Sequence, residues 1–273
     1  MHIDSDKILS LGQNISKELE NCKLCPRNCG VNRLKGEKGF CGISGSGVII
    51  REMINNYEES GLNPSHQVYF AGCNLRCSYC SVENFNLNVP ENGMPIKKVA
   101  AAVKQQEQNT SSLNLLGGEP AVNFGAIIEF LSCENFKNPI VWNSNMYYNS
   151  VVGDMSSEFT DIYLADFKCW AANCCTNILQ AENYRKVAIK RIKQAANRKR
   201  IIVRHLIMPG HIDCCFKPIV EWLKNELPDV EFSPRYNYTP FPERNNCPEG
   251  YLCDKEKKEA EKIITNKTMN IIT

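Results

Sequence analysis

The sequence predicts an α/β fold, a partial (β/α)6 barrel of the TIM type with an N-terminal cysteine-rich metal-binding segment. Three observations predict it. Short apolar segments alternate with helical segments from residue 66 onward, four cysteines crowd the N-terminal region, and 273 residues suit one large domain with a small appendage. We therefore divide the chain into a helix with a cysteine-rich metal-binding module (1–47), the partial barrel (48–240) and a C-terminal tail with a surface helix (241–273).

The N-terminal region combines a helix with a loop rich in cysteine and glycine. Apolar residues recur at helical spacing over residues 5–19, which predicts an amphipathic helix. The segment that follows lacks periodicity and carries the ligands for one metal site: Cys22, Cys25, Cys29 and Cys41. Four thiolates can bind zinc or an iron–sulfur cluster, and both alternatives stay open. A loop module without a core of its own needs such a metal for stability.

The barrel is predicted from its alternating elements. Short apolar segments, typical of buried strands, lie at 67–71, 113–116, 139–142, 161–166, 200–207 and 230–233. Helical segments lie at 96–108, 122–132, 150–157, 180–197 and 215–227, and a final charged helix begins at Asp254. This order implies right-handed βαβ units around a parallel sheet, whose functional loops follow the carboxyl ends of the strands.

Three cysteines follow the first barrel strand at a C-x3-C-x2-C spacing: Cys73, Cys77 and Cys80. Zinc sites usually show paired C-x2-4-C units instead. A four-iron cluster that only transfers electrons takes four protein sulfurs. Three thiolates would therefore leave one iron open to a substrate or cofactor.

The second strand runs directly into Gly117-Gly118-Glu119-Pro120. A glycine pair after a strand lets backbone groups approach a ligand without obstruction by side chains. Alone, this sequence is a common turn. Because it lies one βα unit after the cysteine loop, the two motifs together predict a ligand site at the carboxyl end of the barrel.

Later strand ends add polar side chains at the same edge. Asn143 ends the third strand, Asp166 and Lys168 end the fourth, and His205 lies on the fifth. Asp166 and Lys168 are two positions apart and can share one face. They can bind a zwitterionic cofactor with ribose hydroxyls, or form an internal ion pair. His205 can belong to the same pocket or be a hydrogen-bonded core histidine.

The cysteine loop and the GGEP turn resemble the signature of the radical S-adenosylmethionine (SAM) superfamily. The resemblance implies that the three cysteines hold a [4Fe–4S] cluster whose fourth iron is chelated by SAM, and that Gly117, Gly118 and Glu119 receive the methionine ammonium. It implies cleavage of SAM to a 5′-deoxyadenosyl radical, which takes hydrogen from a substrate, with a reductant such as flavodoxin or ferredoxin. Tyr79 stands where the superfamily carries an aromatic residue that packs against the cluster and adenine; a plain core tyrosine is the alternative.

Within the superfamily, the run from Val141 to Gly210 looks like the pyruvate formate-lyase activating-enzyme branch, and most like its PflX-like homologues. The N-terminal CKLCPRNCGVNR segment and the HIDCC segment that begins at His211 carry this second likeness. In that branch, residues that match four positions line the SAM pocket: Asn143, Asp166, Lys168 and His205. The known activating enzymes remove hydrogen from a glycine Cα of a large partner protein.

Three segments depart from the PflX-like pattern. Ser81-Val82 replaces Gln-Asn after the third cluster cysteine, residues 56–60 replace a His-Trp-Glu-Glu-Pro type sequence, and residues 232–240 replace a Met-x-Gln-Tyr-x-Pro type sequence. We expect these positions to face the substrate. The substrate is therefore open between a protein or peptide and a small molecule. The alternative from another class is a cysteine-rich iron–sulfur electron-transfer protein without radical chemistry.

Composition restricts the remaining classes. A net charge of +2 predicts no strong attraction to nucleic acid, and no apolar run is long enough to span a bilayer. The N-terminus lacks the features of a signal peptide, which predicts a cytoplasmic location, where the 15 cysteines indicate metal ligation rather than disulfides. Cys174-Cys175 and Cys214-Cys215, with Cys169, are either buried thiols in barrel loops or a further cluster or redox pair.

Overall fold

The computed structural model describes residues 5–265 and 270–272 and is built around one eight-stranded sheet. The strands are β1 (Ile49–Asn55), β2 (Ser65–Phe70), β3 (Ser112–Gly117), β4 (Ile140–Ser144), β5 (Ile162–Asp166), β6 (Arg200–Leu206), β7 (Glu231–Arg235) and β8 (Asn270–Ile271). They neighbour one another in sequence order, and every pair from β2 to β8 is parallel, whereas β1 pairs antiparallel with β2. Within the described residues, β1 and β8 end this order, so the barrel is open.

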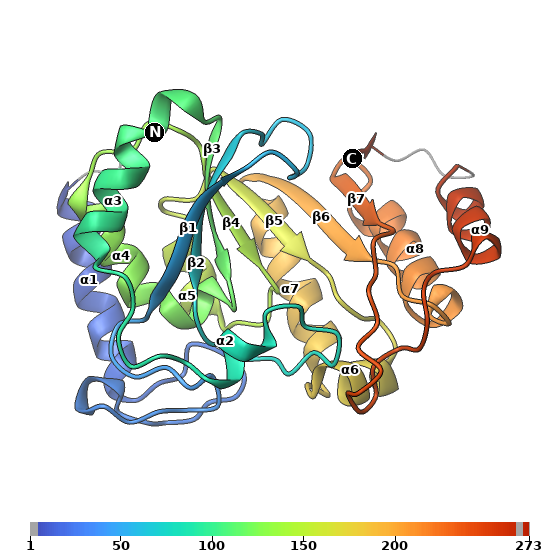
Figure 1. The fold of residues 1–273 in the computed structure, drawn as a ribbon, viewed down its shortest axis with the longest axis horizontal. Coiled ribbons are helices and arrows are strands. Elements are labelled where there is room, and N and C mark those ends of the chain that lie inside the picture. Colours follow the sequence, from blue (N-terminus) through green and yellow to red (C-terminus); the bar gives the residue numbers. More distant parts are fainter. Residues whose placement is uncertain (1–4, 266–269, 273) are drawn as a thin grey trace.

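Helices cover the outer face of the curved sheet (Figure 1). The α-helices of the described residues are α1 (Ser5–Glu20), α2 (Glu83–Leu87), α3 (Ile96–Gln105), α4 (Phe124–Cys133), α5 (Ser150–Ser156), α6 (Ala172–Leu179), α7 (Tyr184–Ala196), α8 (Lys217–Glu226) and α9 (Asp254–Thr265). The short helices α2 and α6 lie beyond the arrowheads in Figure 1, at the carboxyl ends of the strands. Among the described residues, no helix is both long and apolar enough to cross a membrane.

The six predicted barrel strands are confirmed as β2 to β7. The predictions missed β1, β8, α2 and α6. The helix predicted over 180–197 is wrong at its start, because Gln180 adopts a left-handed conformation (φ 52°) that ends α6, and α7 begins at Tyr184. The other predicted helices correspond to α1, α3, α4, α5, α8 and α9.

The N-terminal helix belongs to the barrel core. Ile8, Leu11, Ile15 and Leu19 are buried, as their helical spacing predicts, and they join the hydrophobic cluster that contains the barrel side chains. Each such side chain contributes about 2 kcal/mol when fully buried. The helix therefore positions the cysteine-rich loop that follows it.

Candidate active site

A cavity of about 510 Å³ opens at the carboxyl ends of the barrel strands. It brings together nearly all the side chains that the sequence predicts for a cluster and SAM: Cys73, Cys77, Tyr79, Cys80, Gly117, Gly118, Glu119, Asn143, Asp166 and Lys168. They come from the loop after β2 and from the carboxyl ends of β3, β4 and β5 with the residues that follow. Parallel strands place these loops at one edge of the sheet, which is why residues almost 100 positions apart meet there.

Two of the three cysteines in the loop after β2 have sulfur atoms that accept hydrogen bonds from N–H groups. The backbone N–H of Leu75 donates to Cys73 Sγ at 3.4 Å, and the Asn86 side-chain amide donates to Cys80 Sγ at 3.3 Å. Burial raises the pKa of Cys77 to about 12 and that of Cys73 well above its usual range. Thiols in such surroundings ionise when a cation binds beside them, which suits metal ligands.

The spread of these sulfurs fits a cluster better than a single ion. Two thiolates on one tetrahedral zinc lie about 3.8 Å apart. Among the described residues, these three cysteines do not form a group with all sulfurs within 4.8 Å of one another. A [4Fe–4S] cluster binds each thiolate to a different iron. The donors present therefore fit the iron–sulfur cluster that the sequence motif implies.

The two glycines of the GGEP turn are required by close backbone packing. A Cβ on Gly117 (φ 123°) would lie 2.3 Å from the backbone of Phe70, and one on Gly118 would lie 1.9 Å from the carbonyl oxygen of Gly72. The backbone N–H of Gly118 donates to the Phe70 carbonyl at 2.7 Å. The glycines thus bring the GGEP turn against the start of the cysteine loop, in addition to lining the cavity.

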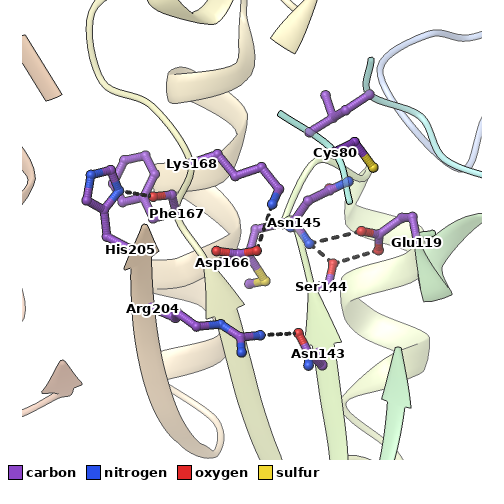
Figure 2. A network of polar contacts seen from close by, with 12 residues as sticks. Cys80, Glu119, Asn143, Ser144, Asn145, Asp166, Phe167, Lys168, Arg204 and His205 are labelled. Carbon is purple, nitrogen blue, oxygen red and sulfur yellow. Dashed lines mark hydrogen bonds and ion pairs between the residues drawn. The ribbon is translucent and has the colours of Figure 1, made fainter. Parts of the chain in front are cut away.

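Glu119 is a buried carboxylate held by three donors. Its Oε1 accepts from the backbone N–H of Ala121 at 3.1 Å and from the Ser144 hydroxyl at 2.7 Å, and its Oε2 accepts from the Asn145 N–H at 2.9 Å (Figure 2). A carboxylate offers about four acceptor positions, so one stays free for a ligand. Burial raises the pKa of Glu119 to about 7, although these hydrogen bonds favour the charged form.

Asp166 and Lys168 form an ion pair on the opposite wall of the cavity. Lys168 Nζ lies 2.7 Å from Asp166 Oδ2 and 5.9 Å from the centre of the Tyr79 ring. Burial opposes both charges, yet Asp166 raises the pKa of Lys168 and Lys168 lowers that of Asp166. The Tyr184 hydroxyl fixes the Lys168 backbone by accepting its N–H at 2.9 Å. The pair is therefore charged and firmly placed beside the cysteines.

His205 does not line the cavity, contrary to the expectation from its strand position. Its ring is buried, and Nδ1 donates to the Phe167 carbonyl at 2.6 Å (Figure 2). The ring also stacks on Phe216 at 6.0 Å. Burial lowers its pKa, which keeps the imidazole neutral. The structure thus matches the alternative reading of a hydrogen-bonded core histidine.

Sequence reasoning missed several residues that complete the site. Asn145 donates its side-chain amide toward Cys73 Sγ at 3.7 Å, and Ser144 holds Glu119. Both belong to the WNSN segment, so its unusual polarity was a signal. Asn86 lies on α2, a helix that no pattern in the sequence predicts.

Charged groups from β6 and from the loop between β1 and β2 meet at the floor of the cavity, where Arg204 and Glu58 line it. Arg204 donates to Asn143 Oδ1 at 2.7 Å and lies 3.7 Å from Glu58 and 3.5 Å from Glu59. Burial raises the pKa of Glu58 to about 7. Although burial also opposes ionisation of Glu59, Arg204 and Arg235 lower the pKa of that carboxyl. The floor therefore holds a polar, paired set of charges.

The four N-terminal cysteines meet around a second, much smaller pocket. Cys29 Sγ accepts the N–H of Phe40 at 3.3 Å, and burial raises the pKa of Cys25 to about 12. Within the described part of the chain, the sulfurs of Cys22, Cys25, Cys29 and Cys41 include no three that lie within 4.8 Å of one another. The four predicted ligands therefore line one pocket, but their sulfurs are not drawn in to the spacing of ligands on a single ion.

The cysteine-rich module packs directly on the cluster loop. Phe40 lies between two guanidinium groups, with Arg27 at 3.8 Å and Arg76 at 4.2 Å from its ring centre. Arg27 Nε donates to the Asn74 carbonyl at 3.0 Å, and Arg76 donates to the Phe40 carbonyl. Arg27 and Phe40 come from the module, whereas Asn74 and Arg76 come from the C-x3-C-x2-C loop.

Comparison with known proteins identifies the class. The family model described as the Radical SAM superfamily matches residues 68–223, more than half of the chain. The protein belongs to the radical SAM superfamily, and it is a radical SAM enzyme for which the family implies a [4Fe–4S] cluster and SAM.

Among individual proteins, the chain is similar to the uncharacterized protein MJ0674 of Methanocaldococcus jannaschii. The two are 32% identical over 241 residues, which cover 85% of this chain and 70% of that protein.

Two solved structures resemble the fold. Streptococcus suis SuiB bound to S-adenosylmethionine has a TM-score of 0.54 and 16% identity, covering 73% of this chain and 47% of SuiB. Methylornithine synthase (PylB) has a TM-score of 0.50 and 13% identity, covering 99% of this chain and 75% of the synthase. At these identities the likeness shows the fold, and the chain spans about half the length of SuiB.

Proposed function

We propose that the protein is a PflX-like member of the activating-enzyme branch, which cleaves SAM at a cluster held by Cys73, Cys77 and Cys80 and takes hydrogen from a peptide or protein. The observation that supports this proposal is the meeting of the three thiols with Glu119 and the Asp166–Lys168 pair in one cavity. An external reductant such as flavodoxin or ferredoxin would supply the electron.

When bound, the cluster and SAM supply one-electron cleavage of the sulfonium and a 5′-deoxyadenosyl radical. The chain's own residues bind and orient. The side-chain amides of Asn86 and Asn145 donate toward the cysteine sulfurs and stabilise their negative charge. The free acceptor position of Glu119 is suited to the amino group of SAM, and the Asp166–Lys168 pair to its ribose hydroxyls and carboxylate.

Cleavage of SAM tests this proposal. Anaerobically reconstituted and reduced protein should convert SAM to 5′-deoxyadenosine and methionine. Cys77→Ala should abolish the products, whereas Cys253→Ser, which changes an exposed thiol in the tail, should not. Iron-loaded protein that forms no deoxyadenosine under any reducing condition would instead favour the electron-transfer reading.

The peptide or protein substrate is supported by a groove that adjoins the cavity. This groove, of about 1010 Å³, lies between β7, α9 and residues 56–58, and shares Glu58 and Asn237 with the central cavity. A peptide bound in this groove would lie next to the cavity at these two shared residues. Two of the segments that depart from the PflX-like pattern, residues 56–60 and 232–240, contribute to the lining of this groove together with α9.

Isotope transfer tests the substrate class. Peptides deuterated at Cα should transfer deuterium to 5′-deoxyadenosine, and Tyr236→Ala, in the groove wall, should reduce this transfer without changing cleavage of SAM alone. A small charged molecule is the second candidate, favoured by the paired charges of Arg204, Glu58 and Glu59 on the cavity floor. Deuterium transfer from small molecules but from no peptide would favour it.

For the N-terminal site, we propose a second [4Fe–4S] cluster rather than zinc. Support comes from the sulfur spacing, which is wider than one tetrahedral ion accepts. Reconstituted protein should then hold roughly eight irons per chain, and Cys25→Ser should reduce this to roughly four. One zinc per chain that disappears in Cys25→Ser would contradict the proposal.

A further inference from the structure

Cys174, His211 and Cys214 form a compact group of metal-ligating atoms outside the cavity. Within residues 5–265 and 270–272, they are the one group of three or more cysteine, histidine or carboxylate side chains whose ligand atoms all lie within 4.8 Å of one another. Cys174 lies in the first turn of α6, after β5. A short π-helical turn (Ile212–Phe216) follows β6. His211 immediately precedes this turn and Cys214 lies within it, three residues further along the chain.

The sulfur separation matches two thiolates on one ion. Cys174 Sγ and Cys214 Sγ lie 3.8 Å apart, and tetrahedral zinc with Zn–S bonds near 2.3 Å places its thiolates about 3.8 Å apart. A disulfide would need a separation of about 2.05 Å. This pair therefore differs from the wider sulfur sets of the two proposed clusters.

The histidine is oriented for the same role. His211 Nδ1 lies 2.7 Å from the Pro209 carbonyl oxygen. A carbonyl has no proton to give, so Nδ1 carries the proton and Nε2 keeps a free lone pair that can bind a metal ion. Metal-binding histidines are usually fixed in this way by a backbone carbonyl at the other ring nitrogen.

We infer that Cys174, His211 and Cys214 bind a zinc ion. Two thiolates and an imidazole are ligands that zinc prefers. Binding replaces the two thiol protons, which leave to solvent, and changes no oxidation state. His211 and Cys214 are partly exposed, so a water can take the fourth position. The neighbouring Cys215 sulfur is engaged elsewhere, since it accepts the N–H of Trp170 at 3.3 Å.

The ion would fasten α6 in place. At the other end of α6, the carbonyls of Ile178 and Leu179 accept the backbone N–H groups of Ser78 (2.9 Å) and Arg76 (3.1 Å) from the cluster loop. The zinc would join the first turn of α6 to the turn after β6. The zinc therefore has a structural role: by fixing α6, it would stabilise the loop that carries Cys77, which is hydrogen-bonded to the end of that helix.

Metal content of the full-length protein tests the inference. Elemental analysis of anaerobically purified, cluster-reconstituted protein should show one zinc that is lost in Cys174→Ser and in Cys214→Ser, while the iron content stays unchanged. Cys133→Ser, which removes a half-buried thiol on α4, is the matched control and should keep the zinc. His211→Cys should also keep it, because three thiolates still bind zinc. Cobalt in place of zinc should give sulfur-to-cobalt charge-transfer absorption in wild type that is absent in Cys174→Ser.

The inference is overturned if the zinc content is the same in wild type and in the folded Cys174→Ser and Cys214→Ser variants. It is equally overturned if mass spectrometry of the native protein finds a Cys174–Cys214 disulfide. Circular dichroism establishes that each variant is folded. Because the readout is zinc, failure here leaves SAM cleavage at the three-cysteine loop untouched.

Discussion

The backbone N–H of Asn145 donates to Glu119 Oε2 at 2.9 Å, so the end of β4 holds the carboxylate that follows β3. The side chain of the same Asn145 points the other way, toward Cys73 Sγ at 3.7 Å, and also donates to Asn74 Oδ1 at 2.9 Å. A single residue thus contacts both the carboxylate proposed for SAM and a sulfur proposed for the cluster.

Asn145→Ala should make the cluster harder to reduce. Removing an N–H donor from a thiolate destabilises the reduced, more negative form. A hydrogen bond worth about 1 kcal/mol corresponds to a decrease of roughly 40 mV in a one-electron potential. A redox titration followed by electron paramagnetic resonance measures the reduction potential of the cluster. Asn88→Ala, which changes an exposed asparagine bonded to Asn84, should leave the potential unchanged; a shift of equal size there would refute the assignment.

Binding of SAM should depend on pH through Glu119. Burial raises the pKa of this carboxyl to about 7, so it is increasingly protonated below that pH and loses its charge toward the SAM amino group. The Kd for SAM should rise by about tenfold per pH unit below pH 7 and level off above it. Anaerobic equilibrium dialysis measures this.

Two variants separate Glu119 from the other carboxyl with a raised pKa. Glu119→Gln should bind SAM weakly at every pH. Glu58→Gln should keep the pH dependence, although burial raises the pKa of Glu58 to about 7 as well. If Glu58→Gln abolishes the dependence and Glu119→Gln preserves it, the roles are reversed.

Lys168→Met should destabilise the protein by about 3 kcal/mol, because it leaves Asp166 without its nearest cation in a largely buried position. The double variant Asp166→Asn/Lys168→Met should recover most of this loss, since no unpaired charge remains. Denaturant unfolding measures both. Neither variant should cleave SAM. Recovery of stability without SAM cleavage in the double variant distinguishes a binding role of the pair from a purely structural one.

Gly118→Ala should prevent assembly of the cluster loop. Its Cβ would lie 1.9 Å from the Gly72 carbonyl oxygen, an overlap of backbone that costs about 3 kcal/mol or displaces the loop. Iron content after reconstitution should fall. Gly12→Ala is the contrasting change, because its Cβ meets only Ile128 at 3.8 Å within a helix. It should stabilise the protein by about 0.5–1 kcal/mol.

The barrel was predictable from the sequence because the central parallel strands β3 to β6 are mostly buried and contain short apolar runs. β1 was not predicted, because it pairs antiparallel at one end of the sheet and mixes charged residues such as Arg51 and Glu52 with apolar ones. β8 has two residues, too few for any pattern. α6 was not predicted, because its cysteines, threonine and asparagines have low helix propensity.

Site residues were predictable where a sequence motif specifies the residue type. They were less predictable where only contacts in the folded structure bring the residue to the site. Cys73, Glu119 and Lys168 follow strands directly, so their meeting at one edge follows from the parallel sheet. His205 was misplaced because alternation along a strand cannot tell a side chain that faces the cavity from one that packs under the next helix. The contact of Asn86 with Cys80 depends on α2, which has only five residues.

The position of Phe40 between Arg27 and Arg76 limits how short a working version of the protein can be. A truncation that begins at residue 48 would remove the ring and the carbonyl that hold the Arg76 guanidinium, and would uncover the sulfur-bearing turn beside it. The N-terminal residues thus support the cysteine loop from outside the cavity, and a minimal catalytic fragment has to include them.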